Sequence, residues 1–374
     1  MNVEKLIETF NKNNINSFFG VPDSLLKDLC SYIEDNSNKL NHTITANEGN
    51  AIAMACGHYL ATNNPAVVYM QNSGIGNCVN PLLSLVDEEV YNIPLLMIIG
   101  MRGEVGVKDE PQHIKQGRVT SDLLKAMEIE HSFLPFEDKE AQDKIQKVIE
   151  YIKATKKPYA ILVKKNTFEK YEKLNKYQNN YIMTRQEAIE TIVKKTNNRD
   201  IFVSSTGYIS RELYETREKL NQNHTQDFLT VGSMGHANSI ALAIAQEKKD
   251  RNIYCLDGDG AILMHMGAIP VIASKKLDNF KHIILNNEAH DSVGAQPTVA
   301  KTTDFCKMAL SCGYKEAYCV DNLDDLNKVL DTFTSKKGTQ LLEIKVKCGA
   351  KADLSRPKEK PTENKEIFMN HLKN

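Results

Sequence analysis

Two short polar motifs in the second half of the chain could together bind a metal ion and a phosphate group. The apolar run NIYCL leads directly into Asp257, Gly258, Asp259 and Gly260, and a stretch with a helical pattern follows. Glycines allow a tight turn at this point, and the free N–H groups at a helix start can hold a phosphate. Asp259 would then offer a hard oxygen ligand to the Mg²⁺ that neutralises this phosphate.

The second motif is Asn286 and Asn287 at the end of the apolar run HIILNN, and Asn287 lies 28 positions beyond Asp259. A strand, a crossover helix and a neighbouring strand of this total length bring both groups to one edge of a parallel sheet. Each dipeptide alone would be ordinary turn chemistry. The dinucleotide fingerprint G-x-G-x-x-G is not matched, because the third glycine is missing and no acidic ribose partner is evident.

A candidate catalytic carboxylate lies in the first half. The run HTITA leads into Asn47, Glu48, Gly49 and Asn50, and the helix of small residues AIAMACGHYLAT follows. A glutamate in a first helical turn is most often a partner of the helix dipole. A role in acid–base chemistry is the alternative interpretation.

These motifs need a scaffold that brings strand ends together, and the pattern predicts an α/β fold with parallel sheets. Short apolar runs rich in β-branched residues alternate with amphipathic stretches of helical length, and this alternation occurs twice. The strands expected in the first half are 17–20, 42–46, 66–70, 94–100, 131–136 and 159–164. Those expected in the second half are 200–204, 227–231, 252–256, 282–286, 316–320 and 340–347.

We therefore expect two domains, residues 1–170 and 181–374, each with about six strands and helices on both faces. The polar stretch 166–181 is the predicted linker. A single helix is expected after the Asp-Gly-Asp-Gly turn, over AILMHMGAIPVIASKK. The charged tail after Cys348 predicts a surface arm that ends in a short helix, with a disordered tail as the alternative.

Composition excludes several other classes. The 374 residues are too many for one small binding module, and 47 basic against 48 acidic side chains leave a net charge of −1, which argues against a nucleic-acid partner. The longest apolar run, 93–99, is too short to span a membrane, and the N-terminus lacks the apolar stretch of a signal peptide, so a cytoplasmic protein is expected. The eight cysteines form no C-x-x-C pair, which predicts buried free thiols.

The G-D-G turn followed just under thirty residues later by N-N resembles the cofactor motif of thiamine-diphosphate enzymes. The resemblance implies that Mg²⁺ is bound by Asp259, the side chain of Asn287 and the backbone carbonyl of Ala289. It also implies a set of cofactor-binding residues around them: Thr206, Gly207, Gly232, Met234, Gly258, Gly260, Ala261 and Asp291. In this arrangement Met234 would support the bent cofactor from below.

Glu48 in ANEGNAIAMACGHYLAT matches the position of the glutamate that activates the cofactor in such enzymes. The resemblance implies that Glu48 bonds the pyrimidine ring of thiamine diphosphate and favours its imino tautomer. In this family that glutamate and the diphosphate site of one active site come from different subunits. The resemblance therefore implies at least a homodimer.

The two-domain layout, with no room for a third domain, is similar to the family of phosphonopyruvate and sulfopyruvate decarboxylases. The stretches that carry the likeness are FGVPDSLLKDLC, ITANEGNAIAMACGHYL, QNSGIGNCVNPLLSL, GVKDEPQH, NNEAHDSVGAQPT and SRPKEKPTENK. The implied reaction is the decarboxylation of 3-phosphonopyruvate, a 2-keto acid, to phosphonoacetaldehyde and CO₂ in phosphonate biosynthesis. Sulfopyruvate as substrate is the alternative, followed by a non-catalytic thiamine-diphosphate-binding or dinucleotide-binding protein.

A dianionic phosphonate calls for cationic or donor groups near the reacting carbon. Arg102, Lys108 and His113 lie in the long polar stretch MRGEVGVKDEPQHIKQGR, although ordinary surface charge is the alternative for each. His113 could also relay protons, because it titrates near neutral pH. The remaining substrate candidates are Ser24, His290 and Ser292, and Arg356 in the tail is interpreted as a lid over the site.

Overall fold

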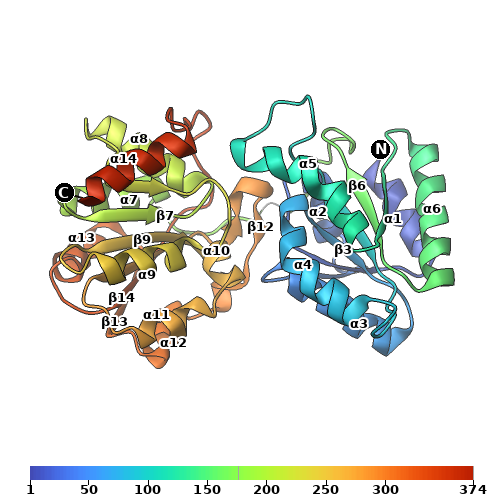
Figure 1. Cartoon of the computed structure of the whole chain (residues 1–374), viewed down its shortest axis with the longest axis horizontal. Coiled ribbons are helices and arrows are strands. Elements are labelled where there is room, and N and C mark those ends of the chain that lie inside the picture. The colour runs from blue at the N-terminus through green and yellow to red at the C-terminus, as the bar shows by residue number, and fades with distance from the viewer. Residues whose placement is uncertain (176, 374) are drawn as a thin grey trace. The chain divides into compact units, whose positions relative to one another are not determined.

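The computed structural model describes residues 1–175 and 177–373, and it divides into two compact units, Met1–Lys176 and Tyr177–Asn374. Each unit contains one parallel six-stranded sheet covered by helices (Figure 1). The predicted fold class is therefore confirmed, and the described residues form no third domain between the two units.

The first unit is built around a sheet with the strand order β2-β1-β3-β4-β6-β5. Its strands are β1 (Ser17–Gly20), β2 (Asn41–Ile44), β3 (Val67–Gln71), β4 (Leu96–Gly100), β5 (Glu130–Phe133) and β6 (Tyr159–Val163). Its helices are α1 (Val3–Lys12), α2 (Lys27–Asp35), α3 (Glu48–Thr62), α4 (Ile75–Pro81), α5 (Pro111–Ala126) and α6 (Asp138–Thr155).

The central strands of this sheet are buried on both faces, which explains why they read as continuous apolar runs. On β3, Val67 and Tyr69 pack into the core that α1, α2 and α6 cover. The alternate residues Val68 and Met70 pack into the core beneath α3, α4 and α5. Side chains that alternate along one strand therefore supply two separate cores.

The second unit repeats this design with the strand order β13-β14-β10-β9-β7-β8. Its strands are β7 (Ile201–Ser204), β8 (Asp227–Leu229), β9 (Ile253–Gly258), β10 (Phe280–Asn286), β13 (Glu316–Val320) and β14 (Gln340–Lys345), and β11 (Ala289–His290) and β12 (Gln296–Pro297) form a small antiparallel hairpin. Its helices are α7 (Arg185–Lys195), α8 (Tyr208–Lys219), α9 (Ala237–Glu247), α10 (Asp259–Met264), α11 (Ala268–Ser274), α12 (Phe305–Cys312), α13 (Leu323–Phe333) and α14 (Pro361–Lys373).

The single helix expected after the Asp-Gly-Asp-Gly turn is wrong, because two short helices, α10 and α11, occupy that stretch. Pro270 gives the physical reason. Proline lacks an N–H and clashes with the preceding turn inside a helix, but it is tolerated in a first turn. The helix that begins at Ala268 places Pro270 in such a turn.

The C-terminal tail ends in an ordered helix, as predicted, and the disordered alternative is wrong. Asn364 on α14 ties the helix to β8, because its Oδ1 accepts from the backbone N–H of Leu229 and its Nδ2 donates to the carbonyl of Asp227. Phe368 packs beside Phe228. No helix in the described part of the chain is both long and apolar enough to cross a membrane.

The cysteine prediction holds only in part. All eight thiols are free, but only four are buried: Cys30, Cys56, Cys78 and Cys255. Cys319 is exposed, because it lies on β13 at the edge of the sheet. The apolar residues around Cys319 in the sequence do not indicate that its strand lies at the edge of the sheet.

Candidate functional site

The two polar motifs of the second unit lie at the same edge of the sheet. Strand β9 ends at Gly258, and Asp259 is the first residue of α10. Gly258 lies opposite Leu285 in the register of β9 and β10, so Asn286 and Asn287 follow at the matching end of the neighbouring strand. This is the arrangement that the spacing predicts.

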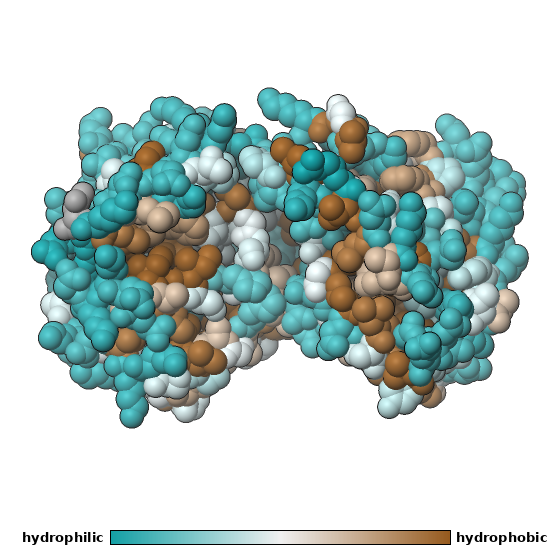
Figure 2. All heavy atoms as spheres, viewed as in Figure 1, coloured by the Kyte–Doolittle hydropathy of each residue, from teal (hydrophilic) through white to brown (hydrophobic). Residues whose placement is uncertain are grey.

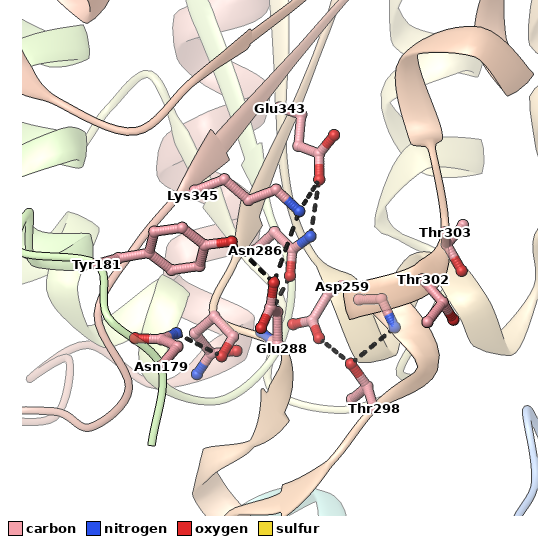
Figure 3. A network of polar contacts seen from close by, with 12 residues as sticks. Asn179, Tyr181, Asp259, Asn286, Glu288, Thr298, Thr302, Thr303, Glu343 and Lys345 are labelled. Atoms are coloured by element: carbon pink, nitrogen blue, oxygen red, sulfur yellow. Dashed lines mark hydrogen bonds and ion pairs between the residues drawn. The ribbon is translucent and has the colours of Figure 1, made fainter. Parts of the chain in front are cut away.

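Asp259 is buried, and it forms no salt bridge with any of the described residues. Burial raises the pKa of its carboxyl group to about 7, and the nearby Asp291 adds to the rise. The hydroxyl of Thr298 donates to Asp259 Oδ2 at 2.5 Å (Figure 3). A buried carboxylate of this kind fits a hard divalent cation, because the cation would favour the ionised form.

The side chain of Asn287 is oriented by a buried ionic network. Its Nδ2 donates to Asp291 Oδ2 at 2.5 Å, and Arg185 contacts the same oxygen at 3.3 Å. Arg185 in turn donates to both carboxylate oxygens of Glu212, at 2.6 and 3.0 Å. Asp291 therefore lies beside the predicted metal ligand as its hydrogen-bond partner. Nothing in the sequence pattern singles out Arg185 or Glu212.

Three predicted residues converge on the first turn of α10. A Cβ atom on Gly260 would lie 2.9 Å from Cε1 of His290 and 3.3 Å from Cε of Met234, so only glycine fits between these side chains. Burial lowers the pKa of His290 to about 4, so its imidazole is neutral near pH 7. Ala261, the next residue, is 4% exposed.

Two further loops reach the same edge. Gly235 has φ +85°, and a Cβ there would lie 2.9 Å from the carbonyl oxygen of Ala261, which packs the loop of Gly232 and Met234 onto α10. Thr206 and Gly207 follow β7. Gly207, with φ +93°, faces the hydroxyl of Ser292, whose Oγ would be 4.0 Å from a Cβ at this glycine.

Glu48 occupies the corresponding place in the first unit, as the first residue of α3. Its side chain is buried, and Asn77 Nδ2 donates to Glu48 Oε2 at 2.7 Å. Gly74 lies against the same carboxylate, so closely that a Cβ would overlap Glu48 Oε1. Sequence reasoning missed both partners, although QNSGIGNCVN contains them.

Two of the predicted substrate residues are joined to each other. Arg102 NH1 donates to Ser24 Oγ at 2.9 Å, while its Nε and NH2 donate to Asp109 at 2.9 and 2.5 Å. Burial alone would raise the pKa of Asp109, but the bond from Arg102 and two backbone N–H donors hold it well below its usual range. The guanidinium is therefore not a free surface charge, and sequence reasoning missed Asp109.

The remaining substrate candidates with titratable or cationic side chains differ in exposure. His113 on α5 is 8% exposed, and its Nδ1 has no hydrogen-bond partner among the described residues. Burial and the charge of Arg102 lower the pKa of His113. Lys108 and Arg356 are exposed.

Asp23, beside Ser24, is a buried carboxyl group that sequence reasoning missed. Burial raises its pKa to about 6. Its Oδ2 accepts from the backbone N–H of Leu25 at 2.9 Å, whereas Oδ1 has no partner in the described part of the chain.

Comparison with known proteins identifies this scaffold. The model of the thiamine pyrophosphate enzyme N-terminal TPP binding domain matches residues 2–129, and that of the C-terminal TPP binding domain matches residues 205–344. The chain belongs to the thiamine pyrophosphate enzyme family. Thiamine pyrophosphate is another name for thiamine diphosphate, so the predicted resemblance is confirmed.

Among thiamine pyrophosphate enzymes, the chain is similar to phosphonopyruvate decarboxylases. It is 32% identical to that of Streptomyces hygroscopicus over 92% of this chain and 87% of the relative, and 32% identical to that of Streptomyces viridochromogenes over 92% and 88%. A sulfopyruvate decarboxylase of Methanosarcina acetivorans is 25% identical over 92% of this chain and 91% of its own.

Proposed function

We propose that this protein catalyses the decarboxylation of 3-phosphonopyruvate to phosphonoacetaldehyde and CO₂ in phosphonate biosynthesis, with thiamine diphosphate and Mg²⁺. The observation that carries the proposal is the 32% identity to two phosphonopyruvate decarboxylases over nearly the whole chain. Glu48 and Asp259, the two carboxylates that the chemistry needs, are both present and buried.

The residues around Asp259 fit a magnesium diphosphate group. Asp259, the Asn287 side chain and the Ala289 carbonyl would supply oxygen ligands to Mg²⁺, and the cation would favour the ionised form of the buried Asp259 carboxylate. The diphosphate would lie against the turns that follow β7 and β9. The proposed lining residues are Thr206, Gly207, Gly258, Gly260 and Ala261. Gly232 and Met234 would support the cofactor's ring system.

Bound thiamine diphosphate supplies the electron sink that stabilises negative charge when CO₂ leaves. Glu48 would hold a proton at the pyrimidine ring, and its burial beside Gly74 and Asn77 fixes the carboxylate in place. His113, whose pKa is lowered, is neutral near pH 7 and can exchange a proton with the reacting carbon.

The phosphonate would be bound by Arg102 and Lys108 on the loop between β4 and α5 of the first unit. Arg102 and Ser24 already form one hydrogen-bonded pair, and Lys108 adds a second positive charge on the same loop. Because Asp109 binds the fork of Arg102, it fixes the direction of the guanidinium. His290 and Ser292 are the proposed substrate contacts of the second unit.

We also propose that the protein is at least a homodimer, with residues 1–170 binding the pyrimidine and residues 181–374 binding the diphosphate of the cofactor. Figure 2 shows apolar side chains gathered over α3 and over α9. On α3, Leu60 is 74% exposed and Met54 39% exposed. A helix that is apolar on all sides is normally buried, so a second subunit is expected to cover these faces.

Light scattering tests this assembly. The molar mass of the wild-type protein in solution should be that of a dimer or a larger oligomer. Leu60→Glu should lower this molar mass. Glu140→Leu, on the exposed face of α6, is the matched control and should leave the mass unchanged. A monomeric wild-type protein would refute the assembly.

The reaction is tested by measuring CO₂ and aldehyde release with thiamine diphosphate and Mg²⁺. Phosphonopyruvate, sulfopyruvate and pyruvate are compared side by side, and kcat/KM should be highest for phosphonopyruvate by at least about tenfold, because a phosphonate carries one more negative charge to pair with cationic groups. Preference for sulfopyruvate would keep the chemistry and change the substrate. No release from any of the three would refute the function.

A further inference from the structure

A short segment without helix or strand, residues 177–181, lies against the loop that follows β10 (Figure 3). Two tyrosines from this segment share one carboxylate. Tyr177 Oη donates to Glu288 Oε2 at 2.5 Å, and Tyr181 Oη donates to Glu288 Oε1 at 2.9 Å. Lys345 lies 3.9 Å from Oε1. Glu288 thus anchors the loop to the segment.

Asn179, between the two tyrosines, bonds the backbone of the same loop. Its Nδ2 donates to the carbonyl oxygens of Asn287, at 2.9 Å, and Val346, at 3.0 Å. Its Oδ1 accepts from the backbone N–H of Cys348 at 3.3 Å. One amide therefore joins the loop after β10 to the chain after β14.

The loop needs such restraint because Glu288 has a left-handed backbone with φ +62°. Residues other than glycine rarely adopt this backbone conformation. The conformation persists only where the surrounding structure holds it in place. The backbone N–H of Glu288 donates to Asn286 Oδ1 at 3.0 Å, and its carbonyl accepts from the N–H of Thr298 at 2.8 Å. The residue is 4% exposed.

We propose that residues 177–181 form a strap that positions the Mg²⁺-binding loop. The strap holds Glu288 in its left-handed turn, and that turn sets the directions of Asn287 and Ala289 on either side of it. This inference rests on the proposed function, which assigns Mg²⁺ to Asn287 and Ala289. Glu288 is an anchor in this arrangement, because both of its carboxylate oxygens already accept tyrosine hydrogen bonds.

The strap is tested with the double variant Tyr177→Phe/Tyr181→Phe, which removes the two hydroxyls and keeps both rings. Tyr171→Phe is the matched control, because Tyr171 Oη donates to the Asp35 carboxylate at 3.2 Å in the first unit. Calorimetry, with Mg²⁺ titrated into protein and thiamine diphosphate, should show about tenfold weaker Mg²⁺ binding for the double variant. Loss of a residue that orients a metal ligand commonly has an effect of this size. The control should bind as the wild type does.

Kinetics separate positioning from general damage. The double variant should need about tenfold more Mg²⁺ for half-maximal rate, and saturating Mg²⁺ should restore kcat to within about threefold of the wild type. A merely structural role would lower kcat by the same factor at every Mg²⁺ concentration. That result would overturn the proposal.

Two substitutions of Glu288 test the role of its left-handed backbone conformation. Glu288→Gly accepts the left-handed turn freely, whereas Glu288→Ala keeps the strain without the tyrosine bonds. We expect Glu288→Ala to weaken Mg²⁺ binding more than Glu288→Gly. Wild-type affinity in Glu288→Ala and in the double tyrosine variant would refute the strap alone, whereas a wild-type protein that binds neither Mg²⁺ nor thiamine diphosphate would refute the proposed function as well.

Discussion

Glu48 and Asp259 are built alike but placed differently. Each is the first residue of a helix that follows a parallel strand, and each is buried. Asp259 follows β9, in the interior of its sheet, and accepts a hydroxyl hydrogen bond from Thr298. Glu48 follows the edge strand β2 and is held by one amide and a glycine.

Under the proposed function, this difference would let one local design serve two kinds of chemistry. A carboxylate surrounded by oxygen-bearing side chains is prepared for a hard metal ion. The Glu48 carboxylate instead accepts one amide hydrogen bond and lies against Gly74. We propose that this carboxylate exchanges a proton with the bound pyrimidine ring. Substitutions at the two positions should therefore fail in different ways.

Glu48→Gln should give the largest loss of turnover. The amide can still accept from Asn77, so folding and cofactor binding should persist, but it cannot hold the proton that the cofactor requires. We expect kcat to fall by at least about 100-fold, the usual effect of removing an acid–base group. Steady-state decarboxylation and calorimetry with thiamine diphosphate measure the two effects. Glu4→Gln, in the exposed first turn of α1, is the control, and near wild-type turnover in Glu48→Gln would remove Glu48 from the mechanism.

Asp259→Ala should fail at binding instead. Loss of a charged oxygen ligand should weaken Mg²⁺-dependent retention of thiamine diphosphate by about 100-fold, at the upper end of the effects known for groups that support a metal. Gel filtration followed by cofactor assay measures retention. Asp324→Ala, in the first turn of α13, is the control. Unchanged retention would contradict the metal assignment and the contrast with Glu48.

The sequence was sufficient for the fold class and the family, because periodicity and strand-end motifs are local signals. Strand β13 was predicted to the residue, and both six-stranded sheets are confirmed. The broken helix was visible in principle, since Pro270 cannot lie deep inside a continuous helix. The roles of the site residues stay predictions.

The partners of the site residues could not be predicted, because they come from distant parts of the chain. Thr298 lies 39 positions from Asp259, and Asn77 lies 29 from Glu48. Threonine and asparagine are common in loops and helices, and no sequence motif marks these two residues. Only the packing of the sheets brings these donors to the carboxylates.

Thr298→Val tests the metal side of the comparison with a smaller effect. The substitution keeps the shape of the side chain and removes the hydroxyl that orients Asp259. We expect the apparent affinity for Mg²⁺ to fall by about tenfold, with little change of kcat at saturating Mg²⁺. Thr298→Ser keeps the hydroxyl and should restore binding. Equal affinities in the valine and serine variants would show that the hydroxyl does not orient the ligand.

The last prediction concerns stability and Asp23, the buried carboxyl group beside Ser24 in the first unit. Burial raises its pKa from 3.8 to about 6, so the folded chain binds this proton more tightly than the unfolded chain does. The stabilisation is complete below about pH 4 and is lost as the pH rises through about 6. Two pKa units correspond to about 3 kcal/mol of unfolding free energy.

Asp23→Asn removes this titration, because the amide is neutral at every pH and can still accept from Leu25 N–H. The thermal midpoint of the variant should match that of the wild type near pH 4.5 and exceed it by several degrees at pH 7.5. Asp122→Asn, on the exposed surface of α5, should show no such change with pH. A difference between Asp23→Asn and the wild type that is constant with pH would mean that Asp23 does not titrate between pH 4.5 and 7.5, with the charge of Arg102 and the backbone N–H donors offsetting burial.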